Sequence, residues 1–297
     1  MSTAAPSIVG NKPSFVLRYF LKRARLGCTL LGGRPAITYS AYRTASTAIH
    51  HAIRSAGVGV ALKAHMLAPE NLVPRVRERH RFSDAEANLP RSCHVGDWAV
   101  RLGIIEPRRE ADFVVSIRDP WSVAHSIFVL SAARLEPTIA TLATAGDAVS
   151  RTRAVDIAER LVFGAFPREL MSRWIRDDLA PALAWDPIAA DFDADAGVGA
   201  YEVGPWRVQL MRADISDERK SESLRRFLGR PSIAVTRKNG ALGFAAANDA
   251  LGAIGREAIA RRPDAVRDLI EDATCAHFWT PAAREALWRR WTEPDER

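Results

Sequence analysis

The chain has little cysteine, little lysine and no long apolar run, and each shortage argues against a class of protein. Its 297 residues include three cysteines, Cys28, Cys93 and Cys275. Because they are odd in number, widely spaced and without a Cys-x-x-Cys pair, the sequence indicates neither a disulfide framework nor a zinc site. A reducing cytoplasm is therefore the expected compartment.

No apolar run reaches the ~18 residues that a membrane-spanning helix needs, and the start of the chain lacks the pattern of a secretion signal. Residues 1–30 form a basic, amphipathic extension, and residues 31–297 are expected to form a single domain. Within the extension, Phe15, Tyr19 and Phe20 alternate with cations. This pattern favours a helix packed on the domain, with peripheral contact to an anionic membrane as the alternative.

Only five of the 42 basic residues are lysine, and the formal net charge is +7 with a pI near 9.8. The planar fork of arginine suits phosphate and sulfate groups, although the same charge also fits a solvated surface. The sequence lacks the clustered basic runs and interleaved aromatic residues typical of nucleic-acid binding. We therefore expect no nucleic-acid partner.

Apolar runs and helical patterns alternate along the chain, without internal repeats or low-complexity linkers. This alternation predicts an α/β fold with a central parallel sheet and helix-rich middle and C-terminal parts. Strands are expected over 36–40, 58–63, 111–117, 206–212 and 233–236. Helices are expected over 46–56, 70–80, 121–134, most of 136–180, 221–228 and the windows after 245.

A first candidate anion-binding stretch is the loop 40–46, between the first expected strand and its helix. Free backbone N–H groups, the Arg43 guanidinium and the hydroxyls of Ser46 and Thr47 are suited to a terminal phosphosulfate, with Arg43 stabilising the charge. The loop lacks the Gly-x-x-x-x-Gly-Lys-Ser/Thr spacing of nucleoside triphosphatases, so a metal-free donor fits better. An ordinary helix N-cap is the alternative for this loop taken alone.

A second stretch runs from Arg118 to Ser126, after the strand 111–117. Arg118 lies at the carboxyl end of this strand, Pro120 suits a first helical turn, and Ser126 falls two turns into the helix. Both Arg118 and Ser126 can then reach one phosphate. Asp119 is expected to cap the helix or to orient Arg118, because a carboxylate beside a helix N-terminus is stabilised in its charged form.

Together the two stretches resemble the 5′-phosphosulfate loop and the 3′-phosphate motif of sulfotransferases that use 3′-phosphoadenosine 5′-phosphosulfate, with the same arginine-to-serine spacing of eight. The chain also resembles a bacterial sulfotransferase-like family linked to capsular polysaccharide synthesis. That resemblance covers roughly residues 35 to 292. Four further segments match that family's pattern: 63–67, 174–186, 197–212 and 277–291.

The resemblance implies a P-loop-like, three-layer fold and a phosphosulfate donor used without a metal. It places Arg43, Thr44, Ala45, Ser46 and Thr47 around the 5′-phosphosulfate and Arg118 and Ser126 at the 3′-phosphate. It also suggests that Arg237 and Lys238 close over the donor, with a solvated turn as the alternative. The acceptor would be a hydroxyl of a carbohydrate or small metabolite. The family's pattern has a basic residue where Val123 stands and a glycine-rich turn where Thr44-Ala45 stands.

The candidate catalytic base is His65, which follows the second expected strand and lies near Lys63. Sulfuryl transfer needs one group to take the acceptor's proton, and related sulfotransferases often place a histidine at this sheet edge. A loop histidine bonded to backbone is the alternative. Of the other histidines, His50 and His51 are expected at packing or surface positions, and His125 is expected beside the phosphate site. His94 and His277 lack the spacing to a cysteine or acidic residue that a metal site needs.

Two other functions compete with a sulfotransferase. One is a P-loop kinase, which the missing lysine spacing disfavours. The other is a noncatalytic phosphate or nucleic-acid binder, or a degenerate scaffold, that uses its arginines only to hold anions. The sequence alone determines neither the acceptor nor the oligomeric state.

Overall fold

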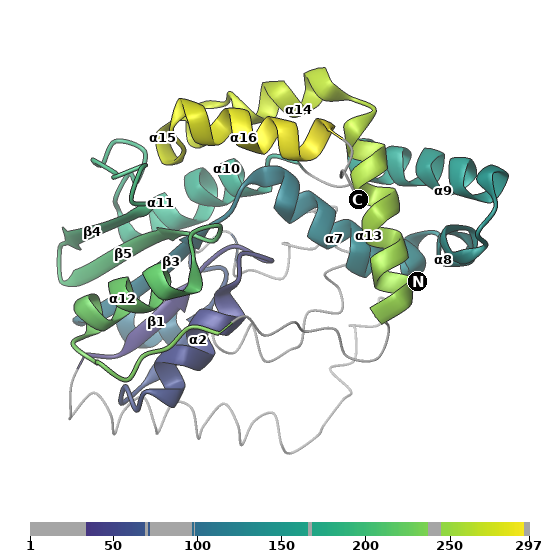
Figure 1. The fold of residues 1–297 in the computed structure, drawn as a ribbon. Coiled ribbons are helices and arrows are strands. Elements are labelled where there is room, and N and C mark those ends of the chain that lie inside the picture. Colours follow the sequence, from purple (N-terminus) through teal and green to yellow (C-terminus); the bar gives the residue numbers. More distant parts are fainter. Residues whose placement is uncertain are drawn as a thin grey trace, which may run out of the picture.

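The computed structural model describes residues 34–68, 71, 97, 99–165, 168–236 and 245–293. Three sequence predictions lie outside the described residues: the N-terminal extension, nearly all of the helix expected over 70–80, and the closing role of Arg237 and Lys238. Across the described ranges the chain forms an α/β fold with a mostly parallel sheet (Figure 1).

The sheet has five strands in the order β2-β1-β3-β5-β4. Strands β2, β1, β3 and β5 run parallel, whereas β4 pairs antiparallel with β5 at one edge. All residues of β1 and β3 are buried, which explains why the two strands are mostly apolar. The strands are β1 (Ala36–Tyr39), β2 (Ala61–Ala64), β3 (Ala111–Ile117), β4 (Val198–Val203) and β5 (Trp206–Arg212).

Two strand predictions need correction, and one strand was missed. The second strand begins at Ala61 and not at residue 58. No strand forms over 233–236, where Val235 donates its amide hydrogen to the Ser221 hydroxyl at 2.8 Å instead of to a neighbouring strand. The edge strand β4 was missed, because its pairing with β5 across a tight turn at Gly204 carries no strong local apolar pattern.

Helices and π-helical turns account for the rest of the regular structure. Among the described residues no single helix is long and apolar enough to cross a membrane. Only α7 and α8 counted together reach the required length and apolar composition, and a bend of 112° separates them. The first elements are α2 (Ser46–Ser55), η1 (Arg101–Ile105), α7 (Pro120–Leu135), α8 (Thr138–Thr144), α9 (Ala148–Arg160), η2 (Leu161–Ala165) and α10 (Leu170–Trp174). They are followed by η3 (Ile175–Leu179), α11 (Ala180–Leu183), α12 (Asp217–Leu228), α13 (Ala245–Ala260), α14 (Pro263–Ile270), α15 (Ala273–Phe278) and α16 (Pro281–Thr292).

Helices cover both faces of the sheet (Figure 1). On one face, α2 and α12 bury Ile53 and Leu224 against Val114 of β3. On the other face, α7 and α10 contribute Trp121 and Trp174 to the larger core. Alternate residues of each strand point to opposite faces, so each strand contributes to both cores.

The strand order places a topological switch between β1 and β3. From β1 the chain passes through α2 to β2 on one side of β1, and it later returns to β3 on the other side. In parallel sheets, such a switch leaves a crevice outside the carboxyl ends of the two diverging strands, where ligands commonly bind. The loops that follow β1 and β3 are the two stretches that the sequence predicts to bind an anion.

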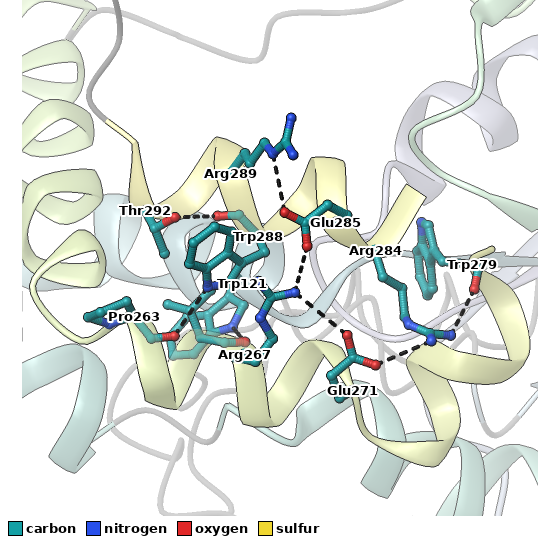
Figure 2. A network of polar contacts seen from close by, with 11 residues as sticks. Trp121, Pro263, Arg267, Glu271, Trp279, Arg284, Glu285, Trp288, Arg289 and Thr292 are labelled. Atoms are coloured by element: carbon teal, nitrogen blue, oxygen red, sulfur yellow. Dashed lines mark hydrogen bonds and ion pairs between the residues drawn. The ribbon is translucent and has the colours of Figure 1, made fainter. Parts of the chain in front are cut away.

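The C-terminal helices α14 and α16 pack together on the side of α7 and α10 away from the sheet (Figure 1). Figure 2 shows the polar network between them. Arg267 of α14 forms a 2.7 Å ion pair with Glu285 of α16, and its guanidinium lies 4.2 Å from the centroid of the Trp288 ring. Trp279 and Trp291 are almost fully buried and belong to the core, whereas Trp288 is only partly buried.

Candidate functional site

The loop after β1 adopts an unusual backbone conformation. Arg43 and Ala45 have φ angles of 67° and 62°, in the left-handed region that non-glycine residues rarely adopt. They are two of the four non-glycine residues with positive φ in the described part of the chain. Such conformations persist only where the surroundings enforce them, and they concentrate at functional sites.

Strand β3 holds this loop in place from below. The Ser116 hydroxyl donates to the Thr44 carbonyl, and the Ser116 amide donates to the Ser40 hydroxyl at 3.0 Å. Thr44 is fully buried and its hydroxyl donates to the Ala41 carbonyl at 2.8 Å. Thr44, which the resemblance places around the 5′-phosphosulfate, is therefore enclosed by its neighbours and exposes no hydroxyl to a ligand.

The two predicted anion-binding stretches converge. The Nε of Arg43 donates to the Ser126 hydroxyl at 2.9 Å, and a terminal guanidinium nitrogen of Arg118 donates to the Arg43 carbonyl at 2.7 Å. These bonds join the loop after β1 to the end of β3 and to the second turn of α7. The residues that the resemblance assigns to two different phosphates thus meet at one place.

The site is electrostatically positive. Desolvation by the surrounding protein and then the charge of Arg118 lower the pKa of Arg43. No carboxylate pairs with Arg43 among the residues that the structure describes. Two like charges held close together in this way favour an anionic ligand, which would offset their repulsion.

Helix α7 begins as the sequence predicts, with Pro120 in its first turn and Asp119 as its cap. The Asp119 carboxylate accepts the Ser122 amide at 2.8 Å, so this helix contributes to the site mainly through side chains. Val123 is buried in the core, which explains why a basic residue has no place there in this chain. His125 bonds the Gly252 carbonyl at 2.8 Å through Nε2, at the flank of the site.

The first turn of α2 presents the remaining loop residues. Ala45 and Thr47 are exposed, whereas Ser46 is almost fully buried. Ala45 offers no side-chain acceptor to the first amide groups of α2, although its carbonyl accepts the Ala48 amide at 3.1 Å. The ammonium of Lys63, on β2, donates to the Thr47 hydroxyl at 2.8 Å and adds a further positive charge to this edge.

His65 lies directly beyond β2, in the same layer of loops. Its Nδ1 bonds the Ser40 carbonyl at 2.7 Å, and its ring stacks on that of Tyr42 with 4.4 Å between centroids. Because a carbonyl can only accept, Nδ1 carries the proton, and the lone pair of the neutral ring is on Nε2. His65 is therefore bonded to the backbone through Nδ1, as the alternative interpretation expects. Its Nε2 carries a lone pair and can accept a proton.

Burial, followed by the charge of Lys63, lowers the pKa of His65 to about 4, and the bond to Ser40 opposes this shift. The ring is therefore neutral at pH 7. An anion bound between Arg43 and Arg118 would favour the protonated form and move this pKa upward, toward the range useful for a general base.

The other predicted residues lie as follows. His50 and His51 are half-buried on α2, as expected for packing positions, and no group of side chains in the described residues could hold a metal ion.

Cys275 is buried and free, and burial raises the pKa of its thiol well above the usual value. A groove of about 540 Å³ lies apart from the predicted site, between α10 and α14, and is lined by Phe163 and Asp268 among others.

Sequence reasoning missed the side chains that hold the His65 loop. The His65 amide donates to Asp97 at 2.7 Å, and the Trp174 indole donates to the His65 carbonyl at 2.7 Å. Asp178 accepts the Leu67 amide at 2.8 Å. The only signal in the sequence was that Trp174 and Asp178 fall within a segment resembling a family pattern, without any indication of what they contact.

No protein-family model, no curated protein and no solved structure matches this chain.

Proposed function

We propose that this protein is a sulfotransferase that moves a sulfuryl group from 3′-phosphoadenosine 5′-phosphosulfate to a hydroxyl of a carbohydrate or small metabolite. The observation that carries the proposal is the convergence of Arg43, Arg118 and Ser126 at the switch between β1 and β3. This cluster of two arginines and a hydroxyl supports an anion-binding site, which a phosphate group of the donor would occupy.

In the proposed reaction, the acceptor oxygen attacks sulfur while the bond between sulfur and the bridging phosphate oxygen breaks. The acceptor proton passes to Nε2 of His65, and 3′-phosphoadenosine 5′-phosphate leaves. Arg43 neutralises charge on the sulfuryl and 5′-phosphate oxygens, and Arg118 with Ser126 holds the 3′-phosphate. The neutral state of His65 and its Nδ1–H tautomer support this role.

The proposal requires no metal for charge neutralisation, because arginine and lysine side chains serve that purpose here. Arg43, Arg118 and Lys63 come from three successive loops or strands around β1. The same basic groups also suit a noncatalytic phosphate binder. What favours an enzyme over that alternative is His65, a neutral histidine placed at the same edge as these cations.

Calorimetric titration with 3′-phosphoadenosine 5′-phosphate tests the donor assignment, with ADP plus magnesium as the comparison. We expect binding of the first ligand alone, and Arg118→Ala should weaken it about 10- to 100-fold, as the loss of a charged hydrogen bond would. Binding of ADP alone would favour a kinase. Binding of neither ligand would reject the donor proposal.

The catalytic assignment needs a second comparison. His65→Ala should bind 3′-phosphoadenosine 5′-phosphate as the unaltered protein does, while losing turnover with any acceptor that the unaltered protein sulfates. A fully active His65→Ala enzyme would reject His65 as the base. Wild-type binding without turnover on any hydroxylated acceptor would instead favour the noncatalytic binder.

A further inference from the structure

A buried carboxylate, Asp178, links the ends of two neighbouring strands. It belongs to η3 and is 1% exposed. Its Oδ1 accepts the Tyr39 hydroxyl and the Leu67 amide, the latter at 2.8 Å. Its Oδ2 accepts the Ala68 amide at 3.3 Å and the Asn71 side-chain amide at 2.6 Å. One side chain therefore takes four hydrogen bonds.

Two of these partners, Tyr39 and Leu67, lie close in sequence to the two residues whose hydrogen bond fixes the His65 ring. Tyr39 ends β1 and directly precedes Ser40, whose carbonyl accepts Nδ1–H of His65. Leu67 lies two residues beyond His65 in the loop after β2. Asp178 thus holds the segment that provides the acceptor and the segment that provides the ring.

The same helical segment holds the loop at another point. Trp174 lies four residues before Asp178, close to one helical turn, and its indole donates to the His65 carbonyl at 2.7 Å. The backbone between the two residues changes from α-helix to the wider π-helix. Single π turns inside helices often occur at functional sites. Here the turn carries the carboxylate that reaches Leu67.

Burying this carboxylate is unfavourable, because desolvation penalises its charge. Desolvation raises the pKa of Asp178 to about 6, against the opposing effect of the hydrogen bonds from Tyr39, Asn71 and the loop amides. The pKa of Tyr39 is raised well above its usual value, so its hydroxyl remains the donor. An apolar side chain would fill the same space without this cost, but it would leave the Leu67 amide without an acceptor.

We propose that Asp178 is a positioning residue that sets the His65 imidazole relative to the loop carrying Arg43, an inference that rests on the function proposed above for His65. By fixing the ends of β1 and β2 together, it keeps Nδ1–H on the Ser40 carbonyl and the lone pair on Nε2. Asp178 touches neither donor nor acceptor and acts only through His65.

The experiment compares Asp178→Asn and Tyr39→Phe with the control Asp177→Asn. Asp177 is the adjacent carboxylate, but it is exposed and pairs with Arg176 at 2.7 Å. Nitrogen NMR on imidazole-labelled protein reports the tautomer and titration midpoint of His65 in each variant. Calorimetry with 3′-phosphoadenosine 5′-phosphate and turnover complete the measurements.

In Asp178→Asn we expect a mixed tautomer at His65 and a titration midpoint that moves from about 4 toward the ordinary value of 6.5, because a loosened loop admits water. Turnover should fall at least about tenfold, as expected when a catalytic group is misplaced by about 1 Å. Affinity for 3′-phosphoadenosine 5′-phosphate should stay within about threefold, since no phosphate contact is removed. Tyr39→Phe should shift both His65 readouts in the same direction by less, and Asp177→Asn should change nothing.

An unchanged tautomer and midpoint of His65 in folded Asp178→Asn would overturn the inference, whatever happens to turnover. If that variant does not fold, Tyr39→Phe decides by the same two readouts, because it deletes only one hydroxyl. Failure of the proposed function is distinguishable, since it would appear as absent ligand binding by the unaltered protein. The NMR comparison would then still support or overturn the positioning role.

Discussion

The Nε of Arg43 donates a 2.9 Å hydrogen bond to the Ser126 hydroxyl, although 83 positions separate the two residues in the sequence. This contact joins the loop after β1 to helix α7. Because the switch in strand order lies between β1 and β3, the two segments meet outside the carboxyl ends of their strands. The contact therefore makes one site from two sequence motifs.

Arg43→Ala and Ser126→Ala should each weaken binding of 3′-phosphoadenosine 5′-phosphate, about 10- to 100-fold for the arginine and less for the serine. The double variant should lose less than the sum of the two free-energy changes, because residues in contact are energetically coupled. Calorimetry on the four proteins gives the coupling. Arg226→Ala is the control, since that exposed arginine lies on α12 and pairs only with Glu222 in the described structure. Strict additivity would argue against a shared site.

His65 should make stability depend on pH. Its pKa is about 4 in the folded protein and near 6.5 when unfolded, so the unfolded state binds more protons between these values. The contribution is fully present above about pH 6.5 and is lost as pH falls toward 4, by about 3 kcal/mol in total. His65→Gln lacks this group. The difference in unfolding free energy between the two proteins should therefore shrink on acidification.

Urea unfolding of both proteins at several pH values measures that difference. Other groups with shifted pKa values, such as His50 and Asp178, occur in both proteins and largely cancel. A difference that stays constant from pH 7 to pH 4 would mean that His65 is not desolvated as the structure describes.

Ala45→Gly should stabilise the protein by about 1 kcal/mol, because Ala45 has a φ angle of 62° and glycine adopts that conformation without a steric penalty. The family that the sequence resembles has a glycine-rich turn at this place, and Ala45 adopts the left-handed backbone conformation that glycine favours. Thermal unfolding checks the prediction. Ala48→Gly, within α2, is the control and should instead destabilise by a similar amount. Destabilisation by Ala45→Gly would contradict the prediction.

Arg267→Ala should destabilise the protein by about 1 to 2 kcal/mol, because it removes ion pairs with Glu285 and Glu271 and a cation–π contact with Trp288 (Figure 2). Arg289→Ala, which removes only an exposed pair with the same glutamate, should cost about 0.5 kcal/mol or less. Denaturant unfolding compares them. Neither variant should alter binding of 3′-phosphoadenosine 5′-phosphate, and equal losses of stability would mean that the Trp288 contact contributes nothing.

Local patterns in the sequence sufficed for most elements of the fold. The strands at 111–117 and 206–212 match the structure at both ends, and the helix after the first motif begins at Ser46 as predicted. The apolar pattern and the turn residues that define these elements are local, so a short stretch of sequence is enough to predict them. The sequence analysis missed the edge strand β4 and wrongly predicted a strand over 233–236, because strand pairing depends on the partner strands as well as on the segment itself.

The sequence by itself determined which side chains the proposed phosphosulfate site would use: Arg43, Arg118, Ser126 and His65. Only the tertiary structure decided that Arg43, Arg118 and Ser126 are in contact, because strand order is a long-range property that local periodicity does not contain. It also decided the tautomer of His65, which depends on the Ser40 carbonyl across the sheet edge. The contacts of Asp178 were likewise decided by packing, since a carboxylate far along the chain becomes the acceptor for this loop only after the core has formed around it.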